Sequence, residues 1–477
     1  MTGADATLVA GVDTSTQSCK VLVCDADTGE IVRHGRGSHP NGTEVDPEHW
    51  WTAFEEATQD GLLDGVQALA VGGQQHGMVL LDEHDDVVRP ALLWNDTRSA
   101  GSARELVDEL GGAQVWADRV GVVPLAAITV SKLRWVAEHE PENLRRSATC
   151  VLPHDWLTGQ ILRRLGGAGE GWATDRGDAS GTGYFSAATG GYDHELLRLA
   201  TGGDVDLTLP RVLGPDETAG RARLGTGELL LGPGTGDNAA AALGLGLSAG
   251  EVVMSFGTSG TAFARHSSPT ADASGEVASY ADASGEFLPL VCTLNAARVL
   301  TAGAQVLGTD LAGLEELALR APIGAGGLTL LPYLDGERTP NLPDATGTLS
   351  GITRDNLTPE NLARAVVEGM ILGVGAGVES LRREQVPFER VQLIGGAVAS
   401  RAVREIAADL LGVPVLVPEA GEYVALGAAR QAAWTLRGGE VPRWQVRTAE
   451  QLDARPSDAG EDVRTRYRQL VATVHGG

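Results

Sequence analysis

The chain has 477 residues, enough for two or more domains of ordinary size. Apolar residues make up 43% and charged residues 21%, a composition typical of soluble globular proteins. Because 63 acidic residues stand against 37 basic ones, the net charge of −26 repels nucleic acid and anionic membranes, and we expect neither as a partner. An anionic substrate would need local binding features such as a metal ion, backbone N–H groups or a few placed cations.

Targeting and redox features favour the cytoplasm. No uninterrupted apolar run reaches the ~20 residues that cross a bilayer. The N-terminus lacks the basic segment of a signal peptide. Four cysteines are scattered without metal-ligand spacing, so we expect buried thiols at Cys19, Cys24, Cys150 and Cys292.

The first hundred residues alternate strand and helix patterns. Apolar runs and turn residues predict strands near 8–13, 19–25, 30–34, 66–72 and 78–82, with a helix over 46–59. This β-β-β-α-β order departs from the βαβ repeat of dinucleotide-binding folds.

The rest of the chain contains a second α/β series. Residues 101–165 carry a helical pattern, and 166–232 are rich in Gly, Thr and Asp. The Gly-rich stretch 230–236 indicates a domain junction, which divides the chain into 1–231 and 232–477. The second series comprises a helix from 238, strands near 328–333, 390–394 and 414–417, and helices over 359–384, from 400 and over 425–436. The tail after residue 438 is predicted to be peripheral.

A strand–turn–strand pattern occurs twice, over 9–23 and again over 252–263. Each turn consists of small and hydroxyl residues, which can aim backbone N–H groups and hydroxyls at an anion. Two such turns predict two halves that close on one polyphosphate in a catalytic cleft. The pattern therefore favours a phosphoryl-transfer enzyme.

Asp13 in the first turn predicts a magnesium site. A carboxylate facing a triphosphate requires a cation between them, and Mg²⁺ is commonly held through water. The alternative is a turn Asp that bonds its own backbone. The second copy has Gly257 at this position, which fits one metal and one carboxylate. Lysine occurs only at Lys20 and Lys132, and arginine supplies every other basic side chain apart from histidine. Either a lysine is required at both positions, or the two residues have remained there by chance.

Asp237 follows Gly234-Thr235-Gly236 at the start of an Ala-rich helix. One interpretation is a helix N-cap. The other is a general base that takes the proton from a substrate hydroxyl. The flanking glycines would let a substrate approach the backbone closely.

Three further segments suit ligand binding. Gln74-Gln75-His76 between glycines offers amides and an imidazole to several hydroxyls, or forms a polar turn. Trp94-Asn95-Asp96 ends an apolar run and has the composition of a sugar pocket, although a Trp there can also be core. The turn from Gly395 to Ser400 could receive a nucleotide on bare backbone, or it serves tight packing.

Together these motifs resemble the FGGY carbohydrate kinases, and among them the members that act on D-xylulose. The resemblance runs over about residues 8–435. It is carried by 73–77, 93–96, 236–240, 255–260, 331–340 and Lys132. It implies an α/β fold with two actin/hexokinase-like (ribonuclease H-like) domains flanking a catalytic cleft. The half 1–231 would lie on the sugar side and 232–477 on the nucleotide side.

The resemblance also implies roles for individual residues. Asp237 matches the catalytic base. The substrate contacts would be Gln75, His76, Trp94, Asp96 and Asn238. Asp13 matches the metal-associated carboxylate. The nucleotide contacts would be Asp13, Thr14, Ser15, Thr16, Lys20, Gly257, Thr258, Gly395, Gly396, Ala397 and Ser400. Family members usually have Gly where Ser15 and Ala397 stand, and both replacements are small.

The expected reaction is therefore ATP- and Mg²⁺-dependent phosphorylation of D-xylulose to D-xylulose 5-phosphate, with a homodimer expected from the family. A kinase for another ketose or pentitol is the nearest alternative. A non-catalytic sugar sensor on the same fold is a different class, which the presence of both Asp13 and Asp237 disfavours. A protein-folding or filament ATPase would not need the segments around His76 and Trp94.

Overall fold

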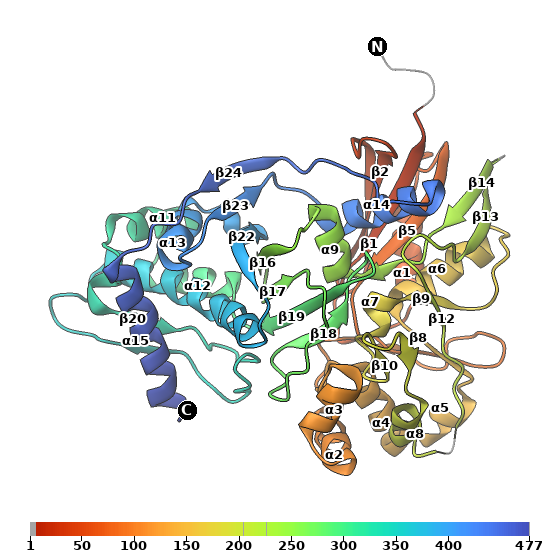
Figure 1. Ribbon diagram of the computed structural model, residues 1–477, viewed down its shortest axis with the longest axis horizontal. Helices are drawn as coiled ribbons and strands as arrows, with labels where there is room; N and C mark the ends of the chain where they lie inside the picture. Colours follow the sequence, from red (N-terminus) through yellow and green to blue (C-terminus); the bar gives the residue numbers. More distant parts are fainter. Residues whose placement is uncertain (1–5, 204, 226, 477) are drawn as a thin grey trace. The chain divides into compact units, whose positions relative to one another are not determined.

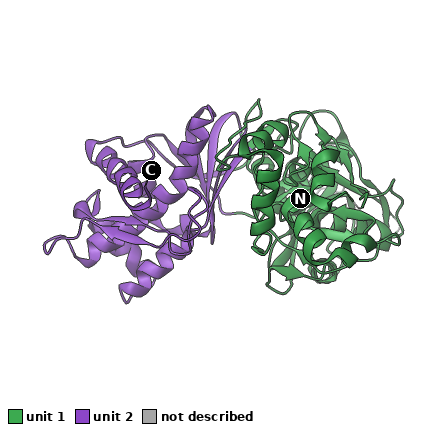
Figure 2. Ribbon diagram, turned by 90° about the horizontal axis from the view of Figure 1, so that it is seen from below, with its two compact units in different colours: residues 1–247, 266–288, 421–446 green, residues 248–265, 289–420, 447–477 purple. Residues whose placement is uncertain are grey.

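The computed structural model describes residues 6–203, 205–225 and 227–476. They form two compact units, which are coloured separately in Figure 2. Unit 1 comprises residues 1–247, 266–288 and 421–446, and unit 2 comprises 248–265, 289–420 and 447–477. The first five residues, where the sequence shows no signal segment, lie outside the described residues.

Unit 1 is built on a mixed sheet with the strand order β13-β14-β5-β1-β2-β3, in which β15 also pairs with β5 (Figure 1). The strands are β1 (Leu8–Thr14), β2 (Ser18–Asp25), β3 (Ile31–Ser38), β5 (Val66–Gly73), β13 (Gly220–Leu224), β14 (Gly227–Leu231) and β15 (Thr235–Gly236). β1 pairs antiparallel with β2 and parallel with β5, and α1 (Glu48–Ala57) lies between β3 and β5 in sequence. The predicted β-β-β-α-β order is therefore confirmed.

Residues of β1 alternate between two apolar cores, as the period of a strand requires. Ala10 and Val12 face a core shared with α1 and α6 (Pro153–Arg164). Val9 faces a second core that it shares with α14 (Tyr423–Arg437). Because β1 is covered on both faces, its sequence is almost continuously apolar.

Helix α14 packs against β1 and α9 (Asp237–Leu245) at backbone distance. A Cβ atom on Gly11 of β1 would lie 1.9 Å from the carbonyl oxygen of Ala425 in α14. A Cβ atom on Gly427 of α14 would lie 1.8 Å from the carbonyl oxygen of Ala240 in α9. Only glycine fits at either position, so the three elements are held in one fixed arrangement.

The remaining elements of unit 1 complete the surroundings of this sheet. The short strands are β4 (Glu44–Val45), β6 (Val79–Leu81), β7 (Ala91–Leu92), β8 (Thr149–Val151), β9 (Ala173–Asp175), β10 (Phe185–Ser186), β11 (Gly191–Tyr192), β12 (Arg211–Leu213) and β18 (Ala278–Ala281). The helices are α2 (Ala100–Leu110), α3 (Ala113–Val120), α4 (Thr129–His139), α5 (Pro141–Arg146), α7 (Arg176–Ala179) and α8 (His194–Thr201).

Unit 2 contains strands in the order β19-β17-β16-β22-β23-β24. They are β16 (Gly250–Phe256), β17 (Gly260–Ala264), β19 (Phe287–Thr293), β22 (Phe388–Ile394), β23 (Val415–Pro418) and β24 (Thr448–Leu452). β16 pairs antiparallel with β17 and parallel with β22, as β1 does with β2 and β5. The strand–turn–strand pattern found twice in the sequence is thus an antiparallel strand pair in both units.

The other elements of unit 2 surround its long helix α12 (Pro359–Arg383). They are α10 (Ala297–Val306), α11 (Leu311–Arg320), α13 (Arg401–Leu410), α15 (Asp458–His475), β20 (Thr329–Leu331), β21 (Thr348–Ser350) and the 3₁₀ turns η1 (Ala325–Gly327) and η2 (Gly396–Ala399). By length and composition alone α12 could cross a membrane, but 78% of its apolar window is buried inside the fold. It also carries a buried ion pair, Arg364 Nε to Glu368 Oε1 at 2.7 Å, so it is a core helix of this unit.

Two sequence expectations about chain organisation need correction. The stretch 230–236, predicted as a domain junction, lies inside unit 1, because β14 and β15 pair with β5 of its sheet and the compact unit continues to residue 247. The tail after 438 is not peripheral: Trp444 is buried against β1 and α14, β24 pairs with β23, and Tyr467 of α15 is buried. In a sequence, glycines that allow close packing cannot be distinguished from glycines at a domain junction.

The close contact between α14 and α9 predicts a large effect of a single methyl group. Gly427→Ala should lower the free energy of unfolding of unit 1 by about 1–3 kcal/mol, because the carbonyl of Ala240 cannot move away without distorting α9. Chemical denaturation followed by fluorescence measures this. Gly101→Ala in α2 is the matched control, since its Cβ would meet nothing within 4 Å. Equal stability of the two variants would contradict the packing argument.

Candidate active site

Asp13 lies inside β1 and is paired across the hairpin with Lys20 of β2. It is therefore a buried strand residue and not a turn Asp. Its Oδ2 lies 3.8 Å from Lys20 Nζ, which in turn lies 2.6 Å from Oε2 of Glu422, the residue that precedes α14. Burial raises the pKa of Asp13 to about 6, Lys20 lowers it and Glu422 adds to the rise.

The turn that follows Asp13 is fixed by contacts from three other segments. The carbonyl oxygen of Ser15 accepts hydrogen bonds from Gln74 Nε2 at 3.4 Å and from His39 Nε2 at 2.9 Å. The indole N–H of Trp94 donates to Thr16 Oγ1 at 3.1 Å. The turn and the Trp94 segment, separate in the sequence, are therefore in contact.

The carboxylate of Asp13 and the hydroxyl of Thr14 fit a hydrated cation with phosphate. The Asp13 side chain is buried, and the Thr14 Oγ1 atom is buried without a hydrogen-bond partner. An unsatisfied buried hydroxyl costs free energy that a ligand would recover. Among the described residues no group of three His, Cys, Asp or Glu side chains is placed to hold a metal ion.

Asp237 is the first residue of α9 and does not cap it. The N-cap is Gly236, and no side chain caps the helix. Asp237 Oδ1 accepts hydrogen bonds from the backbone N–H and the side-chain Nδ2 of Asn238, each at 2.8 Å. The N-cap interpretation is therefore wrong, and the carboxylate, only partly buried, remains reachable.

The charge environment makes Asp237 a weaker acid than usual. Burial raises its pKa to about 7, with further contributions from the carboxylates of Asp13 and Asp178, and the hydrogen bonds from Asn238 oppose the rise. Such a carboxylate holds and releases a proton near neutral pH, which suits general base catalysis.

Gln75, Asp237 and Asn238 are brought together at the ends of β5 and β15. Asn238 Nδ2 donates to Gln75 Oε1 at 3.2 Å. A Cβ atom on Gly236 would lie 2.6 Å from Gln75 Nε2, so the glycine leaves space for this amide. The two sequence motifs that carry these residues are thus parts of one site.

His76 has a left-handed backbone, with a φ of 66°, and its ring is held by two partners. Its Nδ1 lies 2.8 Å from the carbonyl oxygen of Gly181, so Nδ1 carries the proton. The hydroxyl of Tyr280 lies 3.3 Å from Nε2. The backbone carbonyl of His76 accepts a hydrogen bond from Thr129 Oγ1 at 3.1 Å. A strained conformation maintained by several contacts is typical of a functional position.

Asp96 is buried and bound to a neighbour. Its Oδ1 accepts hydrogen bonds from the backbone N–H of Arg98 at 3.0 Å and from its Nε at 2.9 Å. Burial works to raise the pKa of Asp96, but the bonds from Arg98 outweigh it and lower the pKa.

Lys132 is also buried and donates from Nζ to the carbonyls of Ala126 and Ala127, so it fixes the loop before α4.

In unit 2 the two predicted nucleotide motifs adjoin. Gly395 has a φ of 97°, and a Cβ atom there would lie 2.6 Å from the backbone of Phe256, the residue before Gly257. Gly396 is open, with nothing within 4 Å of a Cβ atom, and Thr258 is exposed. Ser400 Oγ donates to Glu315 Oε2 at 2.6 Å. The two turns thus present bare backbone on neighbouring segments.

The structure adds residues that sequence reasoning missed. They lie in and around the segment 175–181, which contacts both sides of the unit 1 site. Asp175 Oδ2 accepts a hydrogen bond from Thr235 Oγ1 at 2.8 Å, and Gly181 holds His76. Ser180 Oγ accepts from the backbone N–H of Ala281, next to Tyr280, at 3.0 Å. The partners of this segment, Thr235, His76 and Ala281, are distant from it in the chain. The only signal in the sequence was therefore the Gly- and Asp-rich composition of the segment.

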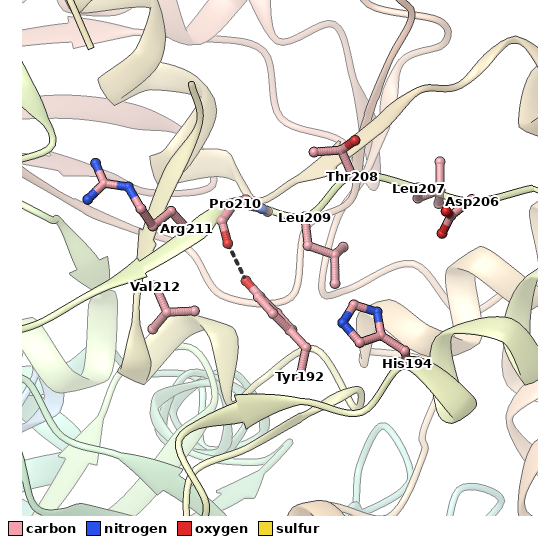
Figure 3. A pocket seen from close by; sticks show the side chains of 9 residues that line it. All are labelled: Tyr192, His194, Asp206, Leu207, Thr208, Leu209, Pro210, Arg211 and Val212. Carbon is pink, nitrogen blue, oxygen red and sulfur yellow. Dashed lines mark hydrogen bonds between the residues drawn. The ribbon is translucent and has the colours of Figure 1, made fainter. Parts of the chain in front are cut away.

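A separate pocket of about 450 Å³ lies elsewhere in unit 1 (Figure 3). It is lined by Tyr192, His194 and residues 206–212. The Tyr192 hydroxyl donates to the carbonyl of Pro210 at 3.0 Å. None of the site residues predicted from the sequence lines this pocket.

Two domains of one known protein family match this chain. The N-terminal domain of the FGGY family of carbohydrate kinases matches residues 8–244, and the C-terminal domain of the same family matches residues 252–436. Together these matches cover most of the chain.

Individual relatives agree with this. A protein of Streptomyces coelicolor named xylulose kinase is 47% identical over 95% of this chain and 94% of its own length. The crystal structure of xylulose kinase from Bifidobacterium adolescentis has a TM-score of 0.89 and 46% identity, covering 97% of this chain and 99% of that one. Glycerol kinase from Plasmodium falciparum has a TM-score of 0.84 at 17% identity over 98% of each chain, which shows the shared fold.

Proposed function

This chain belongs to the FGGY family of carbohydrate kinases, and we propose that it transfers the γ-phosphoryl group of ATP to the terminal hydroxyl of D-xylulose. Relatives named xylulose kinase at 45–47% identity over nearly the whole chain support this substrate. The observation that carries the proposal is the carboxylate of Asp237, with a pKa of about 7, next to Gln75 and Asn238.

The sugar side of the site consists of polar groups that can bond several hydroxyls. Gln75 and Asn238 each offer an amide, and His76 offers an imidazole whose tautomer is fixed by Gly181. Trp94 and Asp96 would complete the sugar contacts at the rim. Held by packing and hydrogen bonds, these side chains orient a hydroxyl toward Asp237.

The transfer step needs one base and one leaving group. The terminal hydroxyl oxygen of the sugar attacks the γ-phosphorus while its proton passes to Asp237. The bond between the γ-phosphorus and the β–γ bridging oxygen breaks, and ADP leaves with that electron pair. Positioning and charge stabilisation supply most of the catalysis in such reactions.

The nucleotide side follows from the two strand pairs. Asp13 would hold Mg²⁺ through water, and the ion would offset the negative charge of the triphosphate. The proposed phosphate contacts in the first strand pair are Thr14, Ser15, Thr16 and Lys20. The other proposed nucleotide contacts are Gly257, Thr258, Gly395, Gly396, Ala397 and Ser400.

Steady-state assays with a panel of ketoses and pentitols test the proposed reaction. ADP formation should depend on D-xylulose and Mg²⁺, and ³¹P NMR should identify a phosphate ester on the terminal carbon. A higher kcat/KM for another ketose or a pentitol would reassign the substrate. Sugar binding without phosphate transfer to any acceptor would favour the sensor interpretation.

Asp237→Asn tests the general base. The change should lower kcat by on the order of 10²–10⁴, the usual contribution of a positioned acid–base group. Sugar affinity should change less, because the amide still bonds a hydroxyl. Thermal stability should not fall in Asp237→Asn, since Gly236 and not Asp237 is the N-cap and the neutral amide replaces a carboxylate whose charge the fold disfavours. A kcat within about threefold of the parent would transfer the role to another carboxylate.

The raised pKa of Asp237 predicts the pH dependence of the reaction. Only the ionised carboxylate accepts a proton, so kcat/KM for the sugar should be constant at high pH and fall below about pH 7. Initial rates between pH 5.5 and 8.5, with coupling enzymes in excess, measure this. A profile that is flat down to pH 5.5 would contradict the assignment.

Gly181→Ala tests the role of His76. The new Cβ atom would lie 2.6 Å from Nδ1 of His76, so the ring must leave the Gly181 carbonyl. Loss of that hydrogen bond, about 1–3 kcal/mol, should raise KM for the sugar by roughly 10- to 100-fold. KM for ATP should stay within about twofold, and Gly101→Ala should change neither value. Equal increases in both KM values would indicate general damage to the fold instead.

A further inference from the structure

His154 of α6 is enclosed by three carboxylates. Its Nδ1 lies 2.8 Å from Oδ2 of Asp178, and its Nε2 lies 3.3 Å from Oδ1 of Asp155 and 3.8 Å from Oδ1 of Asp175. All four side chains are at most 5% exposed. Buried like charges without a counter-ion cost several kcal/mol each, so this cluster is stabilised by protonation of a carboxyl group or by a cation at its centre.

The imidazole supplies that cation. Burial alone would lower the pKa of His154, but the carboxylates of Asp155, Asp178 and Asp175 outweigh it and raise the pKa to about 10. Asp155 is also tied to the backbone, because its Oδ2 accepts from the N–H of Leu152 at 2.8 Å. These contacts hold the imidazole ring at the first turn of α6.

His154 also touches both turns of the site. A Cβ atom on Gly234 would lie 2.3 Å from His154 Cδ2, and one on Gly73 would lie 2.8 Å from His154 Cβ. Gly73 leads to Gln75 and His76, and Gly234 leads to Asp237. The imidazole therefore lies against the segments that carry the sugar contacts and the base.

Asp178, which is the partner of His154 Nδ1, interacts with both Asp237 and His76. Its charge contributes to the raised pKa of Asp237. Burial raises the pKa of Asp178 overall, and His154 together with the backbone N–H of His76 opposes that rise. The ion pair with His154 therefore favours the ionised form of Asp178, and an ionised Asp178 that lost this partner would repel the ionised form of Asp237.

We propose that protonated His154 is a positioning residue for phosphoryl transfer. Its ion pair with Asp178 shields Asp237 from the charge of that carboxylate, and its ring fixes the turns at Gly73 and Gly234. The inference rests on Asp237 as the general base. It goes beyond the proposed function because His154 touches neither substrate nor nucleotide in this assignment. Its effect is transmitted through Asp178.

Other charged groups bear on the same titration. Asp237 faces Asp13 of β1 and Asp178 of α7, and its own helix contributes Asn238. Asp13 in turn faces Lys20 of β2 and Glu422 before α14. His154 faces Asp155 of its own helix and Asp175 at the end of β9, besides Asp178. The variants below change only the His154–Asp178 pair and leave the other groups in place.

Two single substitutions break the same ion pair with opposite changes of charge. His154→Gln removes the cation, so the acid limb of kcat/KM should move to higher pH by about 1 unit. Asp178→Asn removes the repelling carboxylate, so the limb should move to lower pH by a similar amount. The double variant His154→Gln/Asp178→Asn loses both charges, and its limb should lie between those of the single variants.

The opposite directions separate shielding from a structural role. If His154 only fills space, both single variants should lose thermal stability and activity while their limbs stay in place or move the same way, and this would overturn the proposal. Failure of the proposed base is a distinct outcome, because Asp237→Asn would then remain active in the parent background.

A second measurement does not depend on activity. In protein labelled with ¹⁵N-histidine, the ring signal that disappears in His154→Gln belongs to His154. Both nitrogens of this ring should be protonated at pH 8, where an ordinary histidine is neutral. A neutral ring at pH 8 would overturn the proposal even if the variants were impaired. The parent protein alone covers the case in which the substituted proteins fail to fold: if none of its ten histidine rings is doubly protonated at pH 8, the proposal is overturned.

Discussion

The close packing of α14 between β1 and α9 is the constraint on which the unit 1 site depends. Gly11, Gly244 and Gly427 let backbone meet backbone, and a Cβ atom at any of the three would lie within 2.2 Å of a main-chain atom. The helix fixes the β1–β2 hairpin, with Asp13, on one side and the start of α9, with Asp237, on the other. Glu422 at its beginning reaches Lys20, so the same contact also sets the charge next to Asp13.

Electrostatics within this frame explain how an acidic protein can handle a triphosphate. The carboxylates of Asp13, Asp178 and Asp237 are close enough for two of them to raise the pKa of the third. Two cations, Lys20 and His154, are each paired with a carboxylate at 2.6–2.8 Å. These neighbours hold the pKa of Asp237 near neutrality, where the proposed base would act. In the proposed reaction a metal ion and backbone N–H groups would offset the charge of the nucleotide.

Local patterns in the sequence predicted much of the site. The duplicated hairpin, the Ala-rich helix that begins at Asp237 and the Gln75–His76 turn at the end of a strand are all short-range features, and the structure has them at these positions. The same local view offered an N-cap role as the alternative for Asp237, a position that Gly236 fills. It also placed a domain junction at the Gly-rich stretch 230–236, although Gly234 and Gly236 pack against His154 and Gln75.

Long-range contacts were beyond sequence reasoning. His154, Asp178 and Tyr280 meet the site from three segments that are far apart in the chain, and their spacing carries no signal. The return of residues 421–446 to unit 1 could not be predicted either, because a helical pattern gives no indication of which sheet the helix covers. Periodicity identifies a helix but not its packing partners.

Native-state hydrogen exchange tests the central claim, that β1, α9 and α14 form one cooperative body. The amides of Val12, Ala240 and Ala429 should open with free energies that agree within about 1 kcal/mol, because none of the three elements can leave without the others. Exchange of the α14 amides through an opening several kcal/mol below that of β1 would contradict this cooperativity. The β1–β2 hairpin and Asp237 would then be positioned independently.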